Sequence, residues 1–111
     1  MTELTIETLL KKVPERFLPQ KAAGIDAVIQ VVVTGEGGGE WTATIRDQKL
    51  VVETGRATFP RITASADARD VLDIANGRLD PMQAYMSGKV HMTGDLLFAM
   101  RLAGLFDLSV H

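Results

Sequence analysis

The sequence contains no cysteine. That absence excludes disulfide scaffolds, zinc–thiolate centres, iron–sulfur clusters and thiol catalysis, and it fits a reducing compartment. The chain also lacks a basic excess, with 12 Lys and Arg against 14 Asp and Glu, whereas a general nucleic-acid-binding domain normally carries net positive charge. No apolar run approaches the roughly 18 residues of a membrane-spanning helix, and Glu3 stands where a secretory leader would be basic. We therefore expect a cytoplasmic protein with no nucleic-acid partner.

The 111 residues, 46% of them hydrophobic, are enough for one domain and not for two, since domains average roughly 150 residues. A chain of this size buries about two-thirds of its surface on folding, so a real core can form. With 23% charged residues and few low-complexity tracts, the composition is that of a folded chain. We expect residues 1–111 to form a single domain.

Hydrophobic periodicity and turn residues predict the order of the elements. A first helix begins after Thr5 and breaks at Pro14. Asp67 and Asp80 are the predicted caps of two short helices, and a last helix runs from Leu96 to about residue 106. Alternating or β-branched apolar runs predict strands near residues 27–33, 41–46, 50–52, 61–66 and 89–93, the first three forming an antiparallel meander. The fold class is therefore α/β (α+β type), in the order α-β-β-β-β-α-α-β-α.

The patterns that most often carry chemistry have simpler structural explanations in this chain. The glycine-rich stretch 35–39 precedes a strand rather than a helix, so it predicts a hairpin connection and not a phosphate loop. Asp67, Asp70 and Asp73 diverge around a helix and complement its dipole instead of converging on a metal ion. His91 has no neighbouring ligand, and no serine lies in a G-x-S-x-G elbow. We expect no catalytic residue, no metal and no cofactor, and we therefore expect that the protein is not an enzyme.

The most informative segment is the last helix, which is apolar on two sides. The first stripe consists of Phe98, Leu102, Leu105 and Phe106. The second stripe, rotated around the helix, consists of Leu96, Ala99, Met100 and Ala103. A surface helix of a small domain needs only one apolar stripe, which packs on the core. The second stripe can be covered by the helix around residues 82–86, by a partner chain, or by a bound apolar ligand. The periodicity leaves these three alternatives open.

One block of the sequence is specific enough to indicate a family. Residues 80–95, DPMQAYMSGKVHMTGD, lead into the apolar helix that ends at Leu105-Phe106. Together with Phe17, the stretches KAAG at 21–24 and AVIQ at 27–30, and WTATI at 41–45, this block closely resembles the sterol carrier protein two domain. The similarity spans nearly the whole chain. It implies a five-stranded mixed sheet with helices on one side and an apolar tunnel between the sheet and the C-terminal helices.

The resemblance also implies a function. Such domains bind sterols, fatty acids, fatty acyl-CoA or phospholipids and transfer them without catalysis. An apolar cavity needs mainly apolar lining side chains, and the alternative explanation of each such residue is ordinary core packing. The residues that we expect to line or gate the tunnel are Trp41, Met82, Met86, Phe98, Met100, Leu102 and Phe106.

Basic residues concentrate near the start of the chain, at Lys11, Lys12, Arg16 and Lys21. The first helix could thus make transient contact with an anionic membrane, or its cations could meet a CoA phosphate. A solvated charged face explains the same residues without any partner.

Two alternatives from other function classes stay open. An accessory or interaction module would present a lipid-like substrate to a partner enzyme, or form a homodimer, through the apolar C-terminal helix. An enzyme acting on a lipid-like substrate would need a polar residue such as Asp95 or His91, although Asp95 is better explained as a helix cap.

Overall fold

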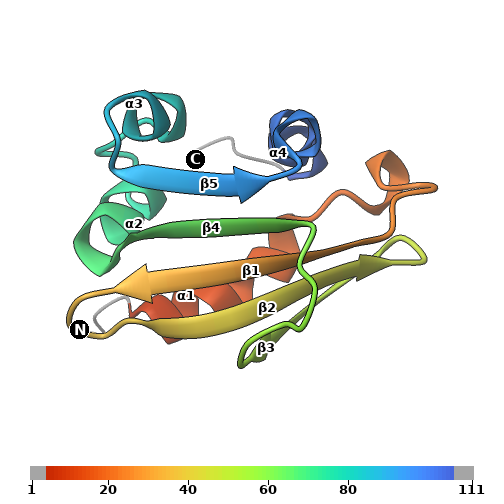
Figure 1. Ribbon diagram of the computed structural model, residues 1–111, viewed down its shortest axis with the longest axis horizontal. Coiled ribbons are helices and arrows are strands. Elements are labelled where there is room, and N and C mark those ends of the chain that lie inside the picture. The colour runs from red at the N-terminus through yellow and green to blue at the C-terminus, as the bar shows by residue number, and fades with distance from the viewer. Residues whose placement is uncertain (1–4, 107–111) are drawn as a thin grey trace.

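Residues 5–106 are described by a computed structural model, which shows a five-stranded mixed sheet (Figure 1). The strands lie in the order β3-β2-β1-β4-β5; the β1–β4 pair is parallel and the other pairs are antiparallel. Their bounds are Ala27–Thr34 for β1, Gly39–Arg46 for β2, Lys49–Thr54 for β3, Ile62–Asp67 for β4 and Val90–Gly94 for β5. The predicted meander of the first three strands and the predicted order of elements are both confirmed.

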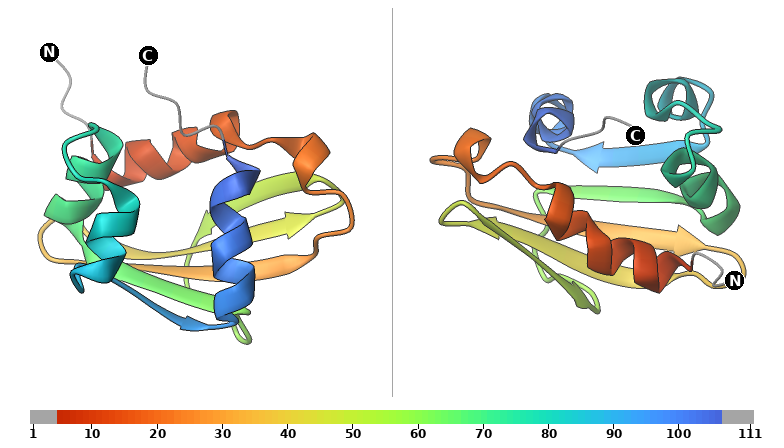
Figure 2. Two further views of the ribbon diagram at one scale, coloured as in Figure 1. Left: turned by 90° about the horizontal axis from the view of Figure 1, so that it is seen from above. Right: turned by 180° about the vertical axis from the view of Figure 1, so that it is seen from behind.

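The helices lie on one face of this sheet, as expected (Figure 2). They are α1 (Ile6–Lys12), α2 (Ala68–Ala75), α3 (Pro81–Met86) and α4 (Leu96–Leu102), with short 3₁₀ helices η1 (Val13–Arg16), η2 (Pro19–Lys21) and η3 (Ala103–Leu105). Ile6 of α1 packs with Val33 of β1 and Trp41 of β2, whereas α3 and α4 both contact β5. The helices are therefore distributed over both halves of the sheet.

Local sequence signals account for where these elements begin. Thr5, Asp67 and Asp80 each accept a hydrogen bond from a backbone N–H in the first turn of α1, α2 and α3. The turn between β2 and β3 places Asp47 and Gln48 at φ 53° and 60°. Two central residues with positive φ match the twist of the flanking strands, so these two residues form a tight turn between β2 and β3.

The last helix is shorter than expected. Its α-helical part stops at Leu102 and continues as η3 to Leu105, whereas the apolar pattern predicts a helix to about residue 106. The reason lies in the backbone that follows: Leu18 N–H donates to the carbonyl of Leu105 at 2.7 Å, and Phe106 forms a β-bridge with Phe17. This pairing pulls the end of the chain out of helical geometry and ties it to the segment after α1.

Alternate strand residues build the core on the helix-covered face. One buried cluster lies around Phe98 of α4 and comprises Phe17, Ala22, Ile25, Ala27, Ile29, Ile45, Ile62, Phe98 and Leu105. A second, smaller cluster joins α1, α2 and the sheet through Ile6, Val33, Trp41 and Ala68. Val31 of β1 packs against both clusters and is itself only half-buried. The core is thus concentrated at two ends of the covered face.

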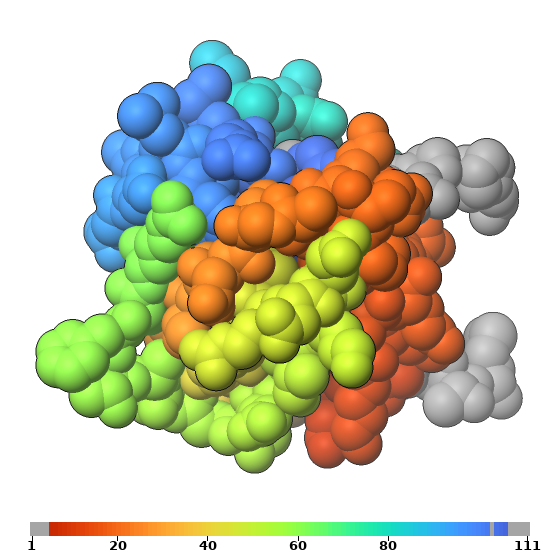
Figure 3. Space-filling model, turned by 90° about the vertical axis from the view of Figure 1, so that its right-hand side faces the viewer, coloured from red at the N-terminus to blue at the C-terminus, as the bar shows by residue number. Residues whose placement is uncertain are grey.

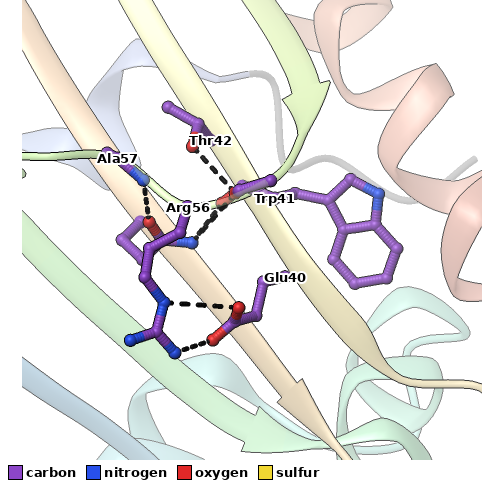
Figure 4. Close-up of polar contacts among 7 residues, drawn as sticks. Glu40, Trp41, Thr42, Arg56 and Ala57 are labelled. Atoms are coloured by element: carbon purple, nitrogen blue, oxygen red, sulfur yellow. Dashed lines mark hydrogen bonds and ion pairs between the residues drawn. The ribbon is translucent and has the colours of Figure 1, made fainter.

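The opposite face of the sheet is crossed by residues 55–61, which we call the strap. Because β3 and β4 are separated by β2 and β1, the chain that joins them has to pass over both strands, and Figure 1 shows it in front of them. Arg56 of the strap forms an ion pair with Glu40 of β2 (Figure 4). The pKa of the Glu40 carboxyl is lowered mainly by the hydrogen bond from Arg56.

Gln30 of β1 is the buried side chain that fixes the strap. Its Nε2 donates to the carbonyl oxygens of Trp41 at 3.0 Å and Gly55 at 3.3 Å. Its Oε1 accepts from the backbone N–H of Ala57, and Thr42 Oγ1 donates to the same Gly55 carbonyl at 3.0 Å (Figure 4). A buried amide with both ends satisfied holds the crossing chain in one position, because any shift would leave buried polar groups unpaired.

Replacing Gln30 by methionine should therefore destabilise the domain. Gln30→Met keeps the side-chain length but leaves the Ala57 N–H and a strand carbonyl without this partner, at a cost of about 1–3 kcal/mol each where no water replaces it. Urea denaturation measures the free energy of unfolding, with Gln20→Met at an exposed position as the control. A Gln30→Met variant as stable as the control would show that the strap is held by other contacts.

Candidate functional site

The middle of the helix-covered sheet face is apolar but not fully covered. Val31, Ala64 and Met92 lie side by side in register across β1, β4 and β5, and Ala66 and Val90 form the next row. All five are only half-buried, although β1 and β4 are interior strands of the sheet. We call these five residues the apolar floor. A floor of this kind, without a charged or hydrogen-bonding side chain, is suited to an apolar ligand and not to a polar substrate.

One end of the molecule beyond the floor is closed by the segment that follows α1. In Figure 3 this segment, orange, lies between α4, blue, and the β2–β3 turn, yellow-green. Gln48 Nε2 of that turn donates to the carbonyl of Pro19 at 3.0 Å, and Phe17 meets Phe106 edge to face at a centroid distance of 5.6 Å. The Phe98 cluster therefore seals this end, and the half-buried rows lie on its other side.

The wall formed by α4 is anchored where the helix begins. Asp95 caps the helix by accepting from the Phe98 N–H at 3.0 Å, and it pairs with Arg61 at 3.0 Å. The Arg61 guanidinium carbon lies 4.1 Å from the centre of the Phe98 ring. A Cβ at Gly94 would lie 2.4 Å from the Arg61 carbonyl oxygen, so glycine permits this close approach of β5 to the start of β4. Asp95 is thus a helix cap and an ion-pair partner, as the cap prediction requires.

The electrostatics of Asp95 follow from these contacts. The hydrogen bond from the Phe98 N–H is the main cause that lowers the pKa of Asp95, and the hydrogen bond and charge of Arg61 lower it further. A carboxylate held in this way stabilises the first turn of α4 while it is ionised.

The structure separates the predicted site residues into two groups. Trp41 and Phe98 are buried core residues at 8% and 2% exposure, and Leu102 and Phe106 are half-buried against the Phe98 cluster. These four lie on the covered side of the sheet. The three methionines lie on the outside instead, with exposed fractions of 64% for Met82, 78% for Met86 and 79% for Met100.

The second apolar stripe of the last helix also faces outward in part. Leu96 and Met100 are exposed, and Ala99 packs against the Phe98 cluster. Of the three alternatives for this stripe, cover by the helix around residues 82–86 is therefore not seen at Leu96 and Met100. The physical reason is that α4 lies over β4 and β5, and the contacts of the described residues place no further layer over its outer side.

The apolar floor itself is what the sequence reasoning missed. Its signal is the pair Ala64 and Ala66, two small side chains on the covered face of an interior strand. Small residues there leave room above the sheet that larger β-branched residues would fill.

Two hollows on the surface of the described residues lie away from the apolar floor. One, of about 610 Å³, is open and polar, and it is lined by Glu36, Asp67, Ala68, Arg69, Leu72, Asp73, Asn76 and Arg78. The other, of about 280 Å³, lies on the opposite sheet face over β2 and β3. The tunnel between the sheet and the C-terminal helices stays a prediction, for which the half-buried floor is the structural basis.

Residues 5–106 show neither a metal-binding cluster nor a membrane-spanning helix. Their His, Asp and Glu side chains form no group of three or more that could hold a metal ion. Among the same residues no helix is both long enough and apolar enough to cross a membrane.

The Asp95 anchor predicts a pH dependence of stability. Because the pKa of Asp95 is lower in the folded state, its contribution is complete above the ordinary value of 3.8 and is lost as the pH falls through the lower folded value. Asp95→Asn keeps a capping side chain but removes the charge. The variant should melt below the wild type at neutral pH, and the difference should shrink once the pH falls below 3.8.

Thermal melting followed by circular dichroism across this pH range measures the difference. Asp26→Asn is the control, because Asp26 pairs with Arg46 at 3.3 Å on the exposed surface, and such pairs contribute little. A difference in melting temperature between Asp95→Asn and wild type that stays constant with pH would contradict a stabilising role of the Asp95 charge.

The chain is similar to known proteins over most of its length. The model of the SCP-2 sterol transfer family matches residues 6–107. Hydroxysteroid dehydrogenase-like protein 2 of Xenopus laevis is 30% identical over 93 residues, which cover 82% of this chain and 22% of that protein. The chain thus spans about a fifth of the length of this curated relative.

Solved structures share the fold. The sec-alkylsulfatase Pisa1 from Pseudomonas sp. superposes with a TM-score of 0.80 at 24% identity, over 97% of this chain and 17% of that one. Palmitated SCP2L2 from Aedes aegypti superposes with a TM-score of 0.71 at 21% identity, over 97% of both chains. The family model covers almost all of the sequence and the fold agrees with it, so the chain belongs to the SCP-2 sterol transfer family.

Proposed function

We propose that this domain binds single lipid molecules on the apolar floor and carries them between membranes or to enzymes. The observation that carries the proposal is the row of half-buried apolar residues Val31, Ala64 and Met92, which runs across the interior strands β1 and β4 to the edge strand β5. An interior strand that is left partly uncovered has room for an apolar molecule in place of a missing side-chain layer. The ligand classes are sterols, fatty acids, fatty acyl-CoA and phospholipids.

The family and its structures support this proposal. The matching family is described as one of sterol transfer, and SCP2L2 from Aedes aegypti, which shares the fold, was solved in palmitated form. A fatty acid is therefore a reasonable first ligand to test on this chain.

The energetics of the floor suit carriage. Each methylene that leaves water contributes roughly 0.8 kcal/mol, but the same methylene gains almost nothing on leaving a bilayer, because lipid tails are already apolar. Exchange with a membrane is then nearly neutral and reversible. No step in such a cycle makes or breaks a covalent bond, so we propose a non-enzymatic carrier.

The predicted site residues take two roles in this proposal. Trp41, Phe98, Leu102 and Phe106 are the walls that surround the floor, because they lie on the covered side of the sheet. The exposed methionines at the outer edge, Met82, Met86 and Met100, are gating residues and not lining residues.

Contact of α1 with an anionic membrane stays a prediction, as does a cytoplasmic location. Lys11, Lys12 and Arg16 are exposed, and Lys11 already pairs with Glu7 at 3.4 Å along the helix. Part of the basic charge of α1 is therefore engaged within the protein, which leaves less for lipid headgroups.

A second candidate function is an accessory domain that presents a lipid-like substrate to an enzyme. It is favoured by the relative in which the matching region makes up 22% of a hydroxysteroid dehydrogenase-like protein. This function uses the same floor but requires a partner, or a second copy, bound through the apolar outside of α4. Co-purification with an enzyme, lost when Met100 is replaced by serine, would favour it over free carriage.

Filling the floor should weaken lipid uptake. Ala64→Phe places a bulky ring over the middle row, and the loss of room for two or three methylenes predicts binding weaker by on the order of tenfold or more. The measurement is titration with a fluorescent fatty acid in solution.

Ser65→Phe is the matched control, since neighbouring strand residues face opposite sides of the sheet. Thermal melting checks that both variants fold. Phe98 is a poorer target, because an arginine there would put an unpaired charge in the core and unfold the domain. Equal uptake by Ala64→Phe and Ser65→Phe would exclude the floor as the binding site.

A further inference from the structure

The exposed apolar side chains of this domain are gathered in one place. Of the eight large hydrophobic residues that are exposed within residues 5–106, six lie on α3 and α4. The other two, Val51 and Phe59, lie on β3 and the strap. Single exposed apolar residues are normal on a soluble domain, but a concentration on two short helices marks an interaction site. We call it the α3–α4 rim, and it consists of Met82, Tyr85, Met86, Leu96, Leu97 and Met100.

The two helices that carry the rim lie at the same edge of the molecule. Figures 1 and 2 show α3 near the start of β5 and α4 near its end, apart from one another but on the same side of the sheet. Both contact β5, whose Val90 and Met92 are half-buried members of the apolar floor. The rim therefore adjoins the edge strand of the floor, where a ligand from outside would arrive.

The free charge around the rim is positive. Asp80 accepts the Gln83 N–H at 3.0 Å as the cap of α3, and Asp95 is engaged with Phe98 and Arg61. Lys89, directly after α3, and Arg101, on α4, are exposed. Within residues 5–106 neither of these two cations has an ion-pair partner. Because Arg61 offsets Asp95, the formal charges of Asp80, Lys89 and Arg101 sum to +1, opposite in sign to the net charge of −2 of the chain.

We propose that the α3–α4 rim docks the domain on an anionic lipid bilayer. Methionine and leucine side chains that protrude this far can enter acyl chains without a complementary shape, which a protein partner would have to provide. Lys89 and Arg101 can lay their aliphatic stems along the apolar layer and place their charges among anionic headgroups. The passage of a lipid from the bilayer to the floor rests on the proposed function; the docking itself does not.

The test is flotation of the purified protein with vesicles of phosphatidylcholine and phosphatidylglycerol, compared with phosphatidylcholine alone. Wild type should bind the anionic vesicles and bind the neutral ones more weakly. The double variant Tyr85→Glu/Leu97→Glu changes one exposed rim residue on each helix, and neither belongs to the proposed gating residues. It should reduce the bound fraction on the order of tenfold or more, because apolar groups that leave water are replaced by carboxylates.

The matched control is Val51→Glu/Phe59→Glu, which makes the same number of apolar-to-acidic changes at exposed positions away from the rim. It adds the same net charge and should retain binding close to wild type. Equal loss in both double variants would overturn the rim as a specific surface, and so would a wild type that binds no vesicles. Lys11→Glu/Lys12→Glu tests the competing surface: loss there, with normal binding of the rim variant, would assign docking to α1.

Two further measurements distinguish membrane docking from dimer formation and from lipid binding on the floor. A wild-type dimer that dissociates in the rim variant, without any vesicle binding, would make a second copy the occupant and overturn the proposal. Uptake of a fluorescent fatty acid from water tests the proposed function alone. The rim variant should keep that uptake and lose transfer from anionic vesicles, and a loss of both in parallel would contradict a separate docking surface.

Discussion

Within residues 5–106, four short α-helices have to cover the apolar face of five strands, and they bury it at its two ends. The Phe98 cluster closes one end and the Ile6, Trp41 and Ala68 cluster closes the other, while Ala64 and Met92 between them stay half-buried. A protein interior is normally packed to the density of an organic crystal. Leaving interior strands partly uncovered costs stability, and an apolar ligand that fills the space recovers that cost.

One short stretch of chain connects the helix-covered face of the sheet with its opposite face. The strap, residues 55–61, is locked to the outer face by the buried amide of Gln30, and its last residue, Arg61, pairs with Asp95 and stacks on Phe98 on the helix side. The same segment therefore fixes the sheet order and the position of α4. The helix α4, which forms a wall beside the floor, is fixed at its N-terminal end, and its exposed outer side remains available for docking.

Most of the fold could be predicted from the sequence, because its signals are local. Caps at Thr5, Asp67 and Asp80 and the alternation of the strands determine the elements. The site was harder to predict, because the exposure of each apolar side chain depends on how the helices pack on the sheet. Met86 and Met100 belong to an apolar pattern that looks the same whether it faces a floor or solvent. The end of α4 was misjudged for a similar reason: the pairing of Leu105 with Leu18 is a long-range contact.

The most direct test of the central claim is methyl NMR of the domain with a carbon-13-labelled fatty acid. The account predicts intermolecular nuclear Overhauser contacts from the acyl chain to the methyl groups of Val31, Ala64, Ala66, Val90 and Met92, which form the floor. Contacts confined to surface methyl groups such as those of Met86 and Met100, or no contacts at saturating ligand, would contradict it.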